Sequence, residues 1–211
     1  MKPSGRNAGQ SPATSAEIST PAYWNAVYAE EGTPRWDLGH FAPALVHWLQ
    51  GRKVSGSALV PGCGFGHDAR LLAQSGLRAL GVDFAPLALA RARELHGGIP
   101  NLEFSDVDMF SLLPARAASF DYVYEYTCFV AVHPSRRGEY ARLLHGLLKP
   151  GGLLIGCFYN HGRPGGPPFD ATREDVLAVF EPHFRIEKFE VTPHSIERRQ
   201  GHELWAEFRR P

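Results

Sequence analysis

The stretch Ala58-Leu59-Val60-Pro61-Gly62-Cys63-Gly64-Phe65-Gly66-His67-Asp68 predicts a buried strand that runs into a glycine-rich turn and then into a helix. A second apolar stretch, Leu77-Arg78-Ala79-Leu80-Gly81-Val82-Asp83, predicts a strand that ends on an acid. Glycines let the backbone approach a ligand closely, and a carboxylate accepts hydrogen bonds from ribose hydroxyls. This arrangement is typical of a site for a nucleoside-containing cofactor at the end of a parallel sheet.

Strand and helix patterns alternate through most of the chain. The expected elements are a helix over 85–96, strands over 101–105 and 119–126, a helix over 134–148, a strand over 153–159, and a helix over 172–180. This alternation predicts an α/β fold, a doubly wound, Rossmann-like, mostly parallel sheet with helices on both faces. Two further stretches, 184–192 and 202–209, predict a C-terminal antiparallel strand pair.

The chain before the first strand divides into a polar tail and an aromatic segment. Residues 1–19 hold almost no large apolar side chain, which predicts a disordered tail before a single domain over 20–211. Residues 20–52 predict two helices with large aromatic residues at Tyr23, Trp24, Tyr28 and Trp36. Two interpretations stay open. These aromatics pack in the core, or they form a helical lid whose aromatic faces hold a cationic or adenine-bearing ligand.

The composition excludes several classes of protein. The 22 basic and 22 acidic residues balance, whereas a nucleic-acid-binding surface needs a net positive field. The three cysteines are widely spaced and form no CxxC pair, which argues against zinc and disulfides and favours a reducing cytoplasm. We expect no bound metal, no membrane span, no nucleic-acid partner, and a monomer that acts on a small molecule.

Two cofactors compete for the glycine turn. The run from Gly64 to Ala69 matches dinucleotide-binding turns, so an NAD-dependent oxidoreductase is one candidate. A dinucleotide rests its pyrophosphate on the helix N-terminus, however, and Asp68 would repel it there. S-adenosylmethionine has no phosphate, and its cationic amino and sulfonium groups suit carboxylates and aromatic faces. This comparison favours S-adenosylmethionine, with Asp83 on the ribose hydroxyls and Asp108-Met109 beside the adenine.

Several motifs, in order along the chain, resemble those of the thiopurine S-methyltransferase superfamily. They are Trp36-Asp37-x-Gly39, the glycine turn 60–68 followed by Gly81-Val82-Asp83, Val130-Ala131-Val132-His133-Pro134, Gly165-Gly166-Pro167-Pro168-Phe169 and Thr192-Pro193-His194-Ser195-Ile196-Glu197-x-Arg199. The resemblance covers about residues 22–209 and is greatest to the plant-type methyl halide and thiol methyltransferases. It implies a class I methyltransferase that uses S-adenosylmethionine and releases S-adenosylhomocysteine.

Carried over by position, the resemblance implies a set of cofactor contacts, and the turn residues Gly64 and Phe84 are expected to border the same site. The implied contacts are Trp24, Tyr28, Trp36, Gly62, Asp83, Asp108, Met109 and Tyr126. Two positions depart from relatives. Tyr28 stands where the relatives usually have Trp, and Glu125-Tyr126-Thr127 replaces the Asp-Arg-Gly context of thiopurine enzymes. The second departure favours small soft nucleophiles over thiopurines as acceptors.

The expected reaction is an in-line displacement of the methyl group by a thiol, halide, thiocyanate or hydrosulfide. Such anions need no general base, so the enzyme can accelerate the reaction by positioning the anion and by removing water from it. The expected acceptor pocket consists of Val27, Tyr28, Tyr126, Phe129 and the loop that ends at Phe169. Tyr126 and Tyr28 are the expected catalytic residues, with the Tyr126 hydroxyl directed at the nucleophile or orienting the methyl group.

Three alternatives remain: a thiopurine or aromatic thiol S-methyltransferase, an NAD-dependent oxidoreductase, and a non-catalytic S-adenosylmethionine-binding protein. Among less informative residues, Cys63 is interpreted as a packing residue. The pair Arg198-Arg199 is interpreted as solvated, with some room for Arg199 to reach the substrate mouth, and the loop 162–168 as a rim of the substrate site.

Overall fold

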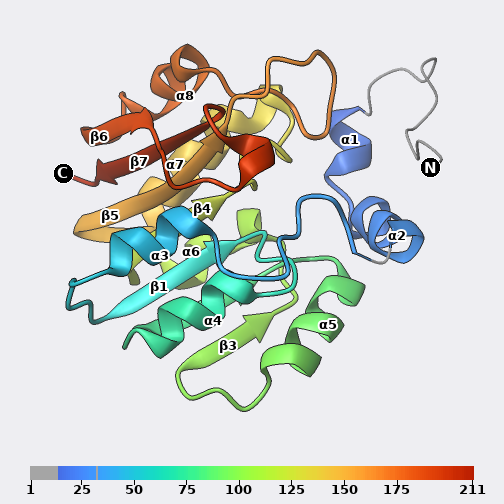
Figure 1. The fold of residues 1–211 in the computed structure, drawn as a ribbon, viewed down its shortest axis with the longest axis horizontal. Helices are drawn as coiled ribbons and strands as arrows, with labels where there is room; N and C mark the ends of the chain where they lie inside the picture. Colours follow the sequence, from blue (N-terminus) through green and yellow to red (C-terminus); the bar gives the residue numbers. More distant parts are fainter. Residues whose placement is uncertain (1–13, 32) are drawn as a thin grey trace.

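A seven-stranded sheet with the strand order β3-β2-β1-β4-β5-β7-β6 forms the centre of the molecule (Figure 1). The computed structural model describes residues 14–31 and 33–211. The strands are β1 Ser57–Pro61, β2 Arg78–Val82, β3 Leu102–Ser105, β4 Phe120–Tyr126, β5 Leu148–Tyr159, β6 Arg185–Val191 and β7 Glu203–Arg209. The first five pair in parallel, and β7 lies antiparallel between β5 and β6. The predicted fold class and C-terminal strand pair are confirmed.

The α-helices are α1 Ser15–Ile18, α2 Pro21–Glu31, α3 Pro43–Leu49, α4 His67–Gln74, α5 Pro86–His96, α6 Leu113–Arg116, α7 Arg137–Leu147 and α8 Arg173–Phe180. Short 3-10 turns occur at η1 Met109–Ser111, η2 Pro134–Arg136 and η3 Glu197–Arg199. Thr172 caps α8, because its side chain accepts from the Asp175 N–H.

Alternate residues of each interior strand face two separate apolar layers. Leu59 of β1 packs in the layer that holds α7 and α8, whereas its neighbours Ala58 and Val60 pack in the layer that holds α3 and α4. Figure 1 shows α3 and α4 on the near face of the sheet. Because both faces are covered, the interior strands read as continuous apolar runs, which is why the sequence pattern revealed them.

The fold begins before residue 20, contrary to the expected disordered tail over 1–19. Residues 15–18 form α1, whose first turn is closed by a reciprocal capping box between Thr14 and Glu17. Ile18 is buried, so one apolar side chain and one cap suffice to place this short helix against the molecule. The prediction was wrong for residues 14–19, and residues 1–13 lie outside the described residues.

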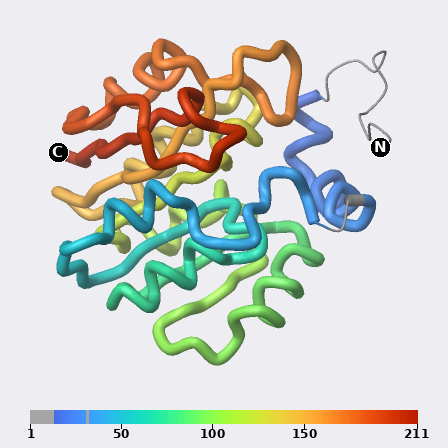
Figure 2. Tube along the Cα trace, in the orientation of Figure 1, coloured from blue at the N-terminus to red at the C-terminus, as the bar shows by residue number. Residues whose placement is uncertain are grey.

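The expected lid over 20–52 also needs correction at its C-terminal end. Leu45 and Trp48 of α3 are buried with strand residues that include Trp205, so α3 belongs to the core layer rather than to a cover. The part that lies at the carboxyl ends of the parallel strands is α1, α2 and the chain up to residue 42. Figure 2 shows this blue segment on the right, at the ends of the parallel strands. We call it the N-terminal cover (residues 14–42, residue 32 aside).

The chain crosses from β3 back to β4, which pairs with β1, so the order of strands reverses between β1 and β4. At such a switch point the loops after the two strands diverge and leave a crevice for a ligand. The N-terminal cover lies over this crevice. The fold therefore brings the glycine turn, the acid after β2 and the loop after β4 to one place.

Candidate functional site

The glycine turn after β1 approaches its neighbours too closely for any side chain. Gly62 and Gly64 have φ values of +58° and +52°, a region that side-chain-bearing residues rarely adopt. A Cβ on Gly62 would lie 2.9 Å from the Cys128 Sγ, and one on Gly64 would lie 3.2 Å from the Tyr28 hydroxyl oxygen. The turn is thus held tightly between the loop after β4 and the N-terminal cover.

Asp83, at the end of β2, links this turn to the next one. Its Oδ2 accepts from the Gly64 N–H and its Oδ1 from the Ala85 N–H, both at 3.0 Å. Burial raises the pKa of this carboxyl, while the backbone donors oppose that shift. The side chain lines the main cavity of the molecule, so a fixed carboxylate is presented where the ribose of a nucleoside would lie.

Aromatic residues of the N-terminal cover pack together above the glycine turn. The Tyr28 ring lies edge-on to Trp36 at 5.8 Å and beside Phe65 at 5.5 Å, and Trp24 lies edge-on to Trp36 at 5.9 Å. The Trp24 indole N–H also donates to the Ile18 carbonyl at 2.8 Å. Tyr28 is buried whereas Trp24 and Trp36 are half-buried, and all three line the cavity, so their positions are compatible with both interpretations of these aromatics.

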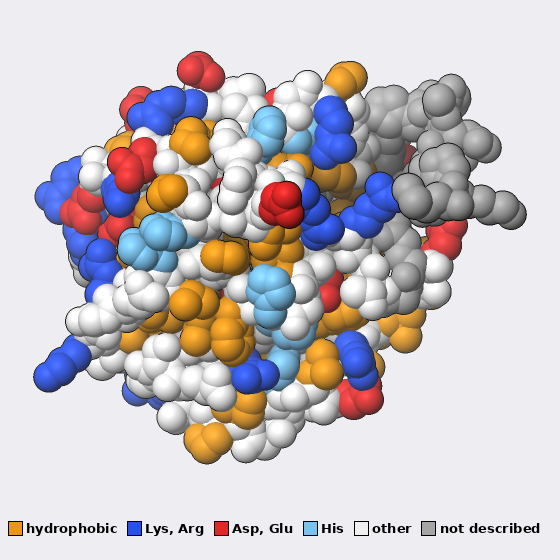
Figure 3. Space-filling view, viewed as in Figure 1, with side chains coloured by type: hydrophobic (Ala, Val, Ile, Leu, Met, Phe, Trp, Pro, Cys, Tyr) orange, Lys and Arg blue, Asp and Glu red, His pale blue; other side chains and the backbone are white. Residues whose placement is uncertain are grey.

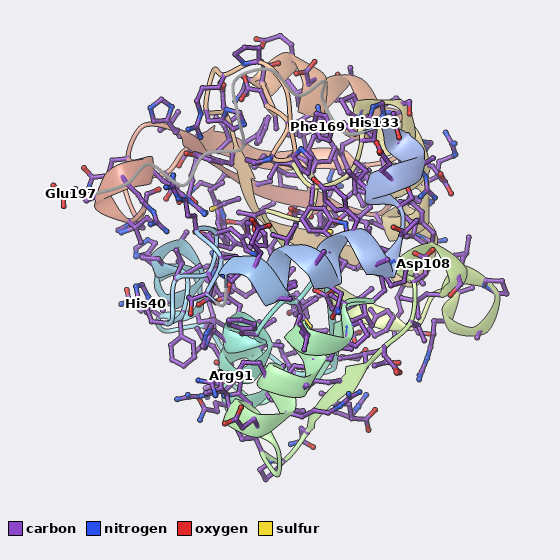
Figure 4. All side chains as sticks on the ribbon, turned by 90° about the vertical axis from the view of Figure 1, so that its right-hand side faces the viewer. His40, Arg91, Asp108, His133, Phe169 and Glu197 are labelled. Carbon is purple, nitrogen blue, oxygen red and sulfur yellow. The ribbon has the colours of Figure 1, made fainter. Side chains whose placement is uncertain are left out.

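A cavity of about 1320 Å³ opens between the N-terminal cover and the strand ends. Figure 4 looks onto this end of the molecule, with α2 crossing in front, His133 and Phe169 above it and Asp108 beside one end. Nine of the residues expected at the cofactor and acceptor sites line this cavity: Trp24, Val27, Tyr28, Trp36, Gly62, Asp83, Phe84, Asp108 and Met109. Gly64 and Tyr126 instead border an adjoining cavity of about 70 Å³.

The turn after β3 supplies Asp108, a second acid that lines the cavity. We call the part of the cavity lined by Asp83, Asp108 and Met109 the cofactor side. Asp108 Oδ1 accepts from the Phe110 N–H at 3.0 Å, and the Met109 Sδ lies 3.8 Å from the Cys128 Sγ. Sequence reasoning missed Arg136, whose guanidinium lies 3.8 Å from the centre of the Phe110 ring and donates to the Ser19 Oγ at 3.1 Å. Its position at the start of a helix gave no signal that it would connect α1 to the cofactor side.

The Tyr126 hydroxyl does not point at the expected nucleophile. It donates to Glu203 Oε1 at 2.9 Å and accepts from an Arg199 N–H at 3.0 Å. Arg199 and Glu203 are themselves a buried ion pair, 3.2 Å apart. Burial, with the Glu203 charge, raises the pKa of Tyr126. The Tyr126 hydroxyl thus donates its proton to a hydrogen bond with Glu203. This corrects the predicted orientation, in which the hydroxyl points at the nucleophile.

Neither phenylalanine of the predicted acceptor pocket lines the cavity. Phe129 is completely buried and lies edge-on to Phe158 at 5.1 Å, because the turn after β4 directs it back into the core. Phe169 is also buried, with its N–H bonded to the Val130 carbonyl at 2.7 Å and its ring edge-on to His133. The loop residues before it, 163–168, do line the cavity, so Phe169 supports the rim from behind.

Four arginines form the other end of the cavity, and the sequence analysis named two of them, Arg198 and Arg199. Arg35, Arg163, Arg198 and Arg199 all line it, and we call these four the basic wall. An Arg198 N–H donates to the Arg35 carbonyl at 2.7 Å, which holds the β6–β7 connection against the N-terminal cover. Arg199 therefore does reach the cavity, and because it is buried the interpretation of the pair as solvated was wrong for Arg199. Arg198 is exposed, as predicted, although it also bonds the backbone of Arg35.

Two further acids act as internal anchors. Asp68 Oδ1 accepts from the Ala42 N–H at 2.8 Å, and burial raises the pKa of Asp68 to about 6. Glu125 is fully buried, accepts from the Phe129 N–H at 2.9 Å and from the Tyr140 hydroxyl, and burial raises its pKa to about 7. Sequence reasoning missed both roles, because Ala42 lies 26 residues from Asp68 and the contact of Glu125 with the Phe129 N–H depends on the path of the turn after β4.

The residues present fit S-adenosylmethionine better than a dinucleotide. An acid stands in the first turn of α4 and holds the N-terminal cover, where a dinucleotide would need to place its pyrophosphate. The carboxylates of Asp83 and Asp108 and the indole side chains of Trp24 and Trp36 border the cavity instead. Such groups suit a ligand with a ribose, an adenine and cationic amino and sulfonium groups.

Comparisons with known proteins agree with this fit. The family model of thiopurine S-methyltransferase matches residues 19–207. Thiocyanate methyltransferase 1 of Arabidopsis thaliana is 37% identical over 85% of this chain and 81% of its own. A thiopurine S-methyltransferase of Pseudomonas fluorescens is 28% identical over 81% of this chain and 86% of its own.

Solved structures show the same fold. A Burkholderia thailandensis 1,6-didemethyltoxoflavin-N1-methyltransferase with bound S-adenosylhomocysteine superposes with a TM-score of 0.70 at 20% identity, over 95% of this chain and 92% of its own. The NAD-dependent alternative thereby loses its support. The chain belongs to the thiopurine S-methyltransferase family and is an S-adenosylmethionine-dependent methyltransferase.

Proposed function

We propose that this enzyme methylates a small soft nucleophile, such as a thiolate, hydrosulfide, thiocyanate or halide. The observation that carries the proposal is the state of Tyr126, whose hydroxyl is held between Glu203 and Arg199. Burial also raises the pKa of Tyr28 well above its usual range. Because neither tyrosine is suited to take a proton near neutral pH, an acceptor that ionises unaided fits this site best.

The similar proteins support this class of acceptor. One relative at 37% identity is a thiocyanate methyltransferase, and a second, at 35% identity over 72% of this chain, is a probable thiol methyltransferase of Arabidopsis thaliana. Methylation of thiopurines or other aromatic thiols belongs to the same chemical class. It remains the alternative, and a thiopurine assayed beside the small anions in the panel below separates the two.

Each group of residues has a positioning role in this proposal. Bound S-adenosylmethionine supplies a methyl group on a sulfonium that an in-line nucleophile displaces. Asp83 holds the ribose hydroxyls, Asp108 and Met109 border the adenine, and Trp24 and Trp36 present aromatic faces to the cationic part of the cofactor. Tyr28 orients the reacting groups as a neutral hydroxyl. The N-terminal cover excludes water, which leaves an anion more nucleophilic than it is in solution.

The test is a panel of acceptors assayed with isotopically methyl-labelled S-adenosylmethionine. We expect methyl thioethers, methyl thiocyanate or methyl iodide from thiols, thiocyanate or iodide, scored by gas chromatography and mass spectrometry. Oxygen and nitrogen nucleophiles of similar size serve as controls and are expected to give no product. Methylation of only oxygen or nitrogen acceptors would overturn the proposal.

We propose further that the chain acts as a monomer in the cytoplasm on a small molecule, without nucleic acid. The balanced charge supports the last point, and the three free cysteines suit a reducing compartment. No helix in the described part of the chain is long and apolar enough to cross a membrane. Light scattering at several protein concentrations tests the oligomeric state, since a monomer keeps a mass near 23.3 kDa.

A further inference from the structure

Three arginines of the basic wall line one cavity without an acidic partner among the described residues. Six other arginines and lysines have acidic partners at 2.6–3.0 Å, among them Arg91 with Glu94 and Arg209 with Glu187. Others in the described part of the chain, such as Arg52 and Arg78, pair with no acid but do not line the cavity. Within residues 14–31 and 33–211, no ion pair joins Arg35, Arg163 or Arg198 to an acid. Glu197, adjacent to Arg198 in sequence, projects outward in Figure 4.

The four arginines form one surface rather than scattered charges. Arg198 bonds the backbone of Arg35, and the Arg199 guanidinium lies 4.9 Å from the centre of the Tyr159 ring. That ring lies 5.2 Å from His161, and the Arg163 Nε lies 3.4 Å from the His161 Nδ1. Figure 3 shows Lys and Arg side chains gathered on this side of the molecule, between the loop after β5 and the β6–β7 connection.

Like charges that line one concave surface create a local positive potential, because the low-dielectric walls focus the field. At the other end of the cavity lie the carboxylates of Asp83 and Asp108, and Arg136, which also lines the cavity, is paired with Glu139 at 2.8 Å. An anion is therefore drawn to the basic wall more than to the cofactor side. A ligand with a nucleophile at one end and a negative group at the other would be oriented by this difference.

The size of the cavity points to an acceptor larger than a bare inorganic anion. Pockets for drug-sized ligands are about 300–1,000 Å³, and this cavity measures about 1320 Å³. A drug-sized nucleoside cofactor would therefore leave space in this cavity for many waters, each of about 30 Å³. A halide or thiocyanate would fill little of the remaining space and would not reach from the cofactor side to all three unpaired arginines.

We infer that the acceptor is an organic thiol that carries an oxyanion substituent, which binds the basic wall while the thiolate faces the methyl group. This inference rests on the proposed function and narrows it. The thiol proton is lost to solvent before the reaction. The thiolate lone pair then forms the new carbon–sulfur bond as the methyl–sulfonium bond breaks, and that electron pair stays on the sulfur of S-adenosylhomocysteine.

The test compares 4-mercaptobenzoate with 4-mercaptobenzamide, near-isosteric thiols that differ by one charge. We expect kcat/KM to favour the acid about 10-fold, because each exposed guanidinium contributes a factor of roughly 1.4–5. In Arg35→Gln, Arg163→Gln and Arg198→Gln, and most in their triple combination, this ratio falls toward 1 through a higher KM for the acid. Raising the salt concentration lowers the ratio likewise. The matched control Arg91→Gln, on the exposed face of α5, keeps the wild-type ratio.

Each contrary outcome has a distinct meaning. If both thiols are methylated but the wild-type ratio is 1 or less, or the triple variant keeps it, the inference is wrong and the proposed function stands. If iodide and thiocyanate are methylated and neither thiol is, the inference is again wrong. If calorimetry shows S-adenosylhomocysteine binding but no soft nucleophile is methylated, the proposed function itself fails and the inference fails with it.

Discussion

The two ends of the cavity hold their charges in different ways. On the cofactor side, the carboxylates are fixed by backbone N–H groups within turns: Gly64 and Ala85 donate to Asp83, and Phe110 donates to Asp108. At the basic wall, Arg35, Arg163 and Arg198 are exposed and have no acidic partner in the described part of the chain, whereas Arg199 is buried beside Glu203. In the proposed arrangement, the methyl donor therefore binds a rigid site and the acceptor a more adaptable one.

The largest effect is expected where the two ends meet, at the buried Arg199–Glu203 pair beside Tyr126. In Glu203→Ala, the Arg199 charge loses its partner at a site from which water is excluded. Removal of one member of such a pair costs about 3–5 kcal/mol of unfolding free energy, which corresponds to a fall in melting temperature of about 10 °C for a chain of this size. Urea titration and calorimetry measure the change.

The double variant Arg199→Met with Glu203→Leu is the matched control, because it removes both charges and keeps the volume. We expect it to recover most of the lost stability. If Glu203→Ala alone were as stable as the wild type, the pair would not anchor the basic wall. The contrast with the backbone-held cofactor side would then be weaker than the geometry indicates.

The next effect concerns Glu125, which fixes the loop between the two ends through the Phe129 N–H. Because burial raises its pKa to about 7, the folded protein binds more protons than the unfolded chain between about pH 4.5 and 7. Stability is therefore greatest at low pH within this window and falls as pH rises, by about 3 kcal/mol in total. The raised pKa of Asp68 adds an effect of the same sign up to about pH 6.

Glu125→Gln removes the titrating group and keeps an acceptor for the Phe129 N–H. We expect it to flatten the fall in unfolding free energy above pH 6 and to exceed the wild type in stability at pH 8. Glu190→Gln, at an exposed position on β6, should leave the wild-type pH profile as it is. A wild-type protein whose stability rises between pH 6 and 8 would contradict the assignment.

A third effect is expected on the cofactor side, in Asp83→Asn. One carboxylate oxygen becomes an NH₂ group, so either the Gly64 N–H or the Ala85 N–H loses its acceptor. Hydrogen bonds to charged groups are worth about 1.5–3 kcal/mol, so S-adenosylhomocysteine should bind about 10- to 100-fold more weakly by calorimetry. Asp106→Asn, an exposed acid after β3 that does not line the cavity, should retain the wild-type Kd. Equal affinity in both variants would remove Asp83 from the cofactor site.

The fold and the cofactor side follow from local sequence, whereas the acceptor side does not. The glycine turn and Asp83 lie at the ends of apolar strands, and a parallel sheet brings such ends together whatever the loops contain. The long strand β5 was still predicted too short. It begins at Leu148, because Gly151 turns with a φ of +74° and its N–H bonds the Arg210 carbonyl, so the chain pairs where a break was expected.

The missed or misplaced residues depend on contacts between segments far apart in sequence. Phe129 follows a strand end like a ligand-binding residue, yet the turn after β4 directs it into the core. Arg35 and Arg198 come together only because η3 packs on the N-terminal cover, across more than 160 residues of chain. Nothing in the local pattern of an Arg-Arg pair distinguishes this contact from a solvated surface.

The smallest effect concerns the contact between the N-terminal cover and the cofactor side. The Asn25 Oδ1 accepts from the Leu87 N–H at 3.0 Å, near the start of α5. In Asn25→Ala this bond is lost, which should cost about 0.5–1.5 kcal/mol of unfolding free energy; Asn25→Asp keeps an acceptor and is the matched control. If the cover closes over the cofactor, Asn25→Ala should also weaken S-adenosylhomocysteine binding several-fold, because binding must then order the cover without this contact. If the affinity is unchanged while stability falls, the cover is a fixed wall of the site, and the adaptable part of the molecule is confined to the basic wall.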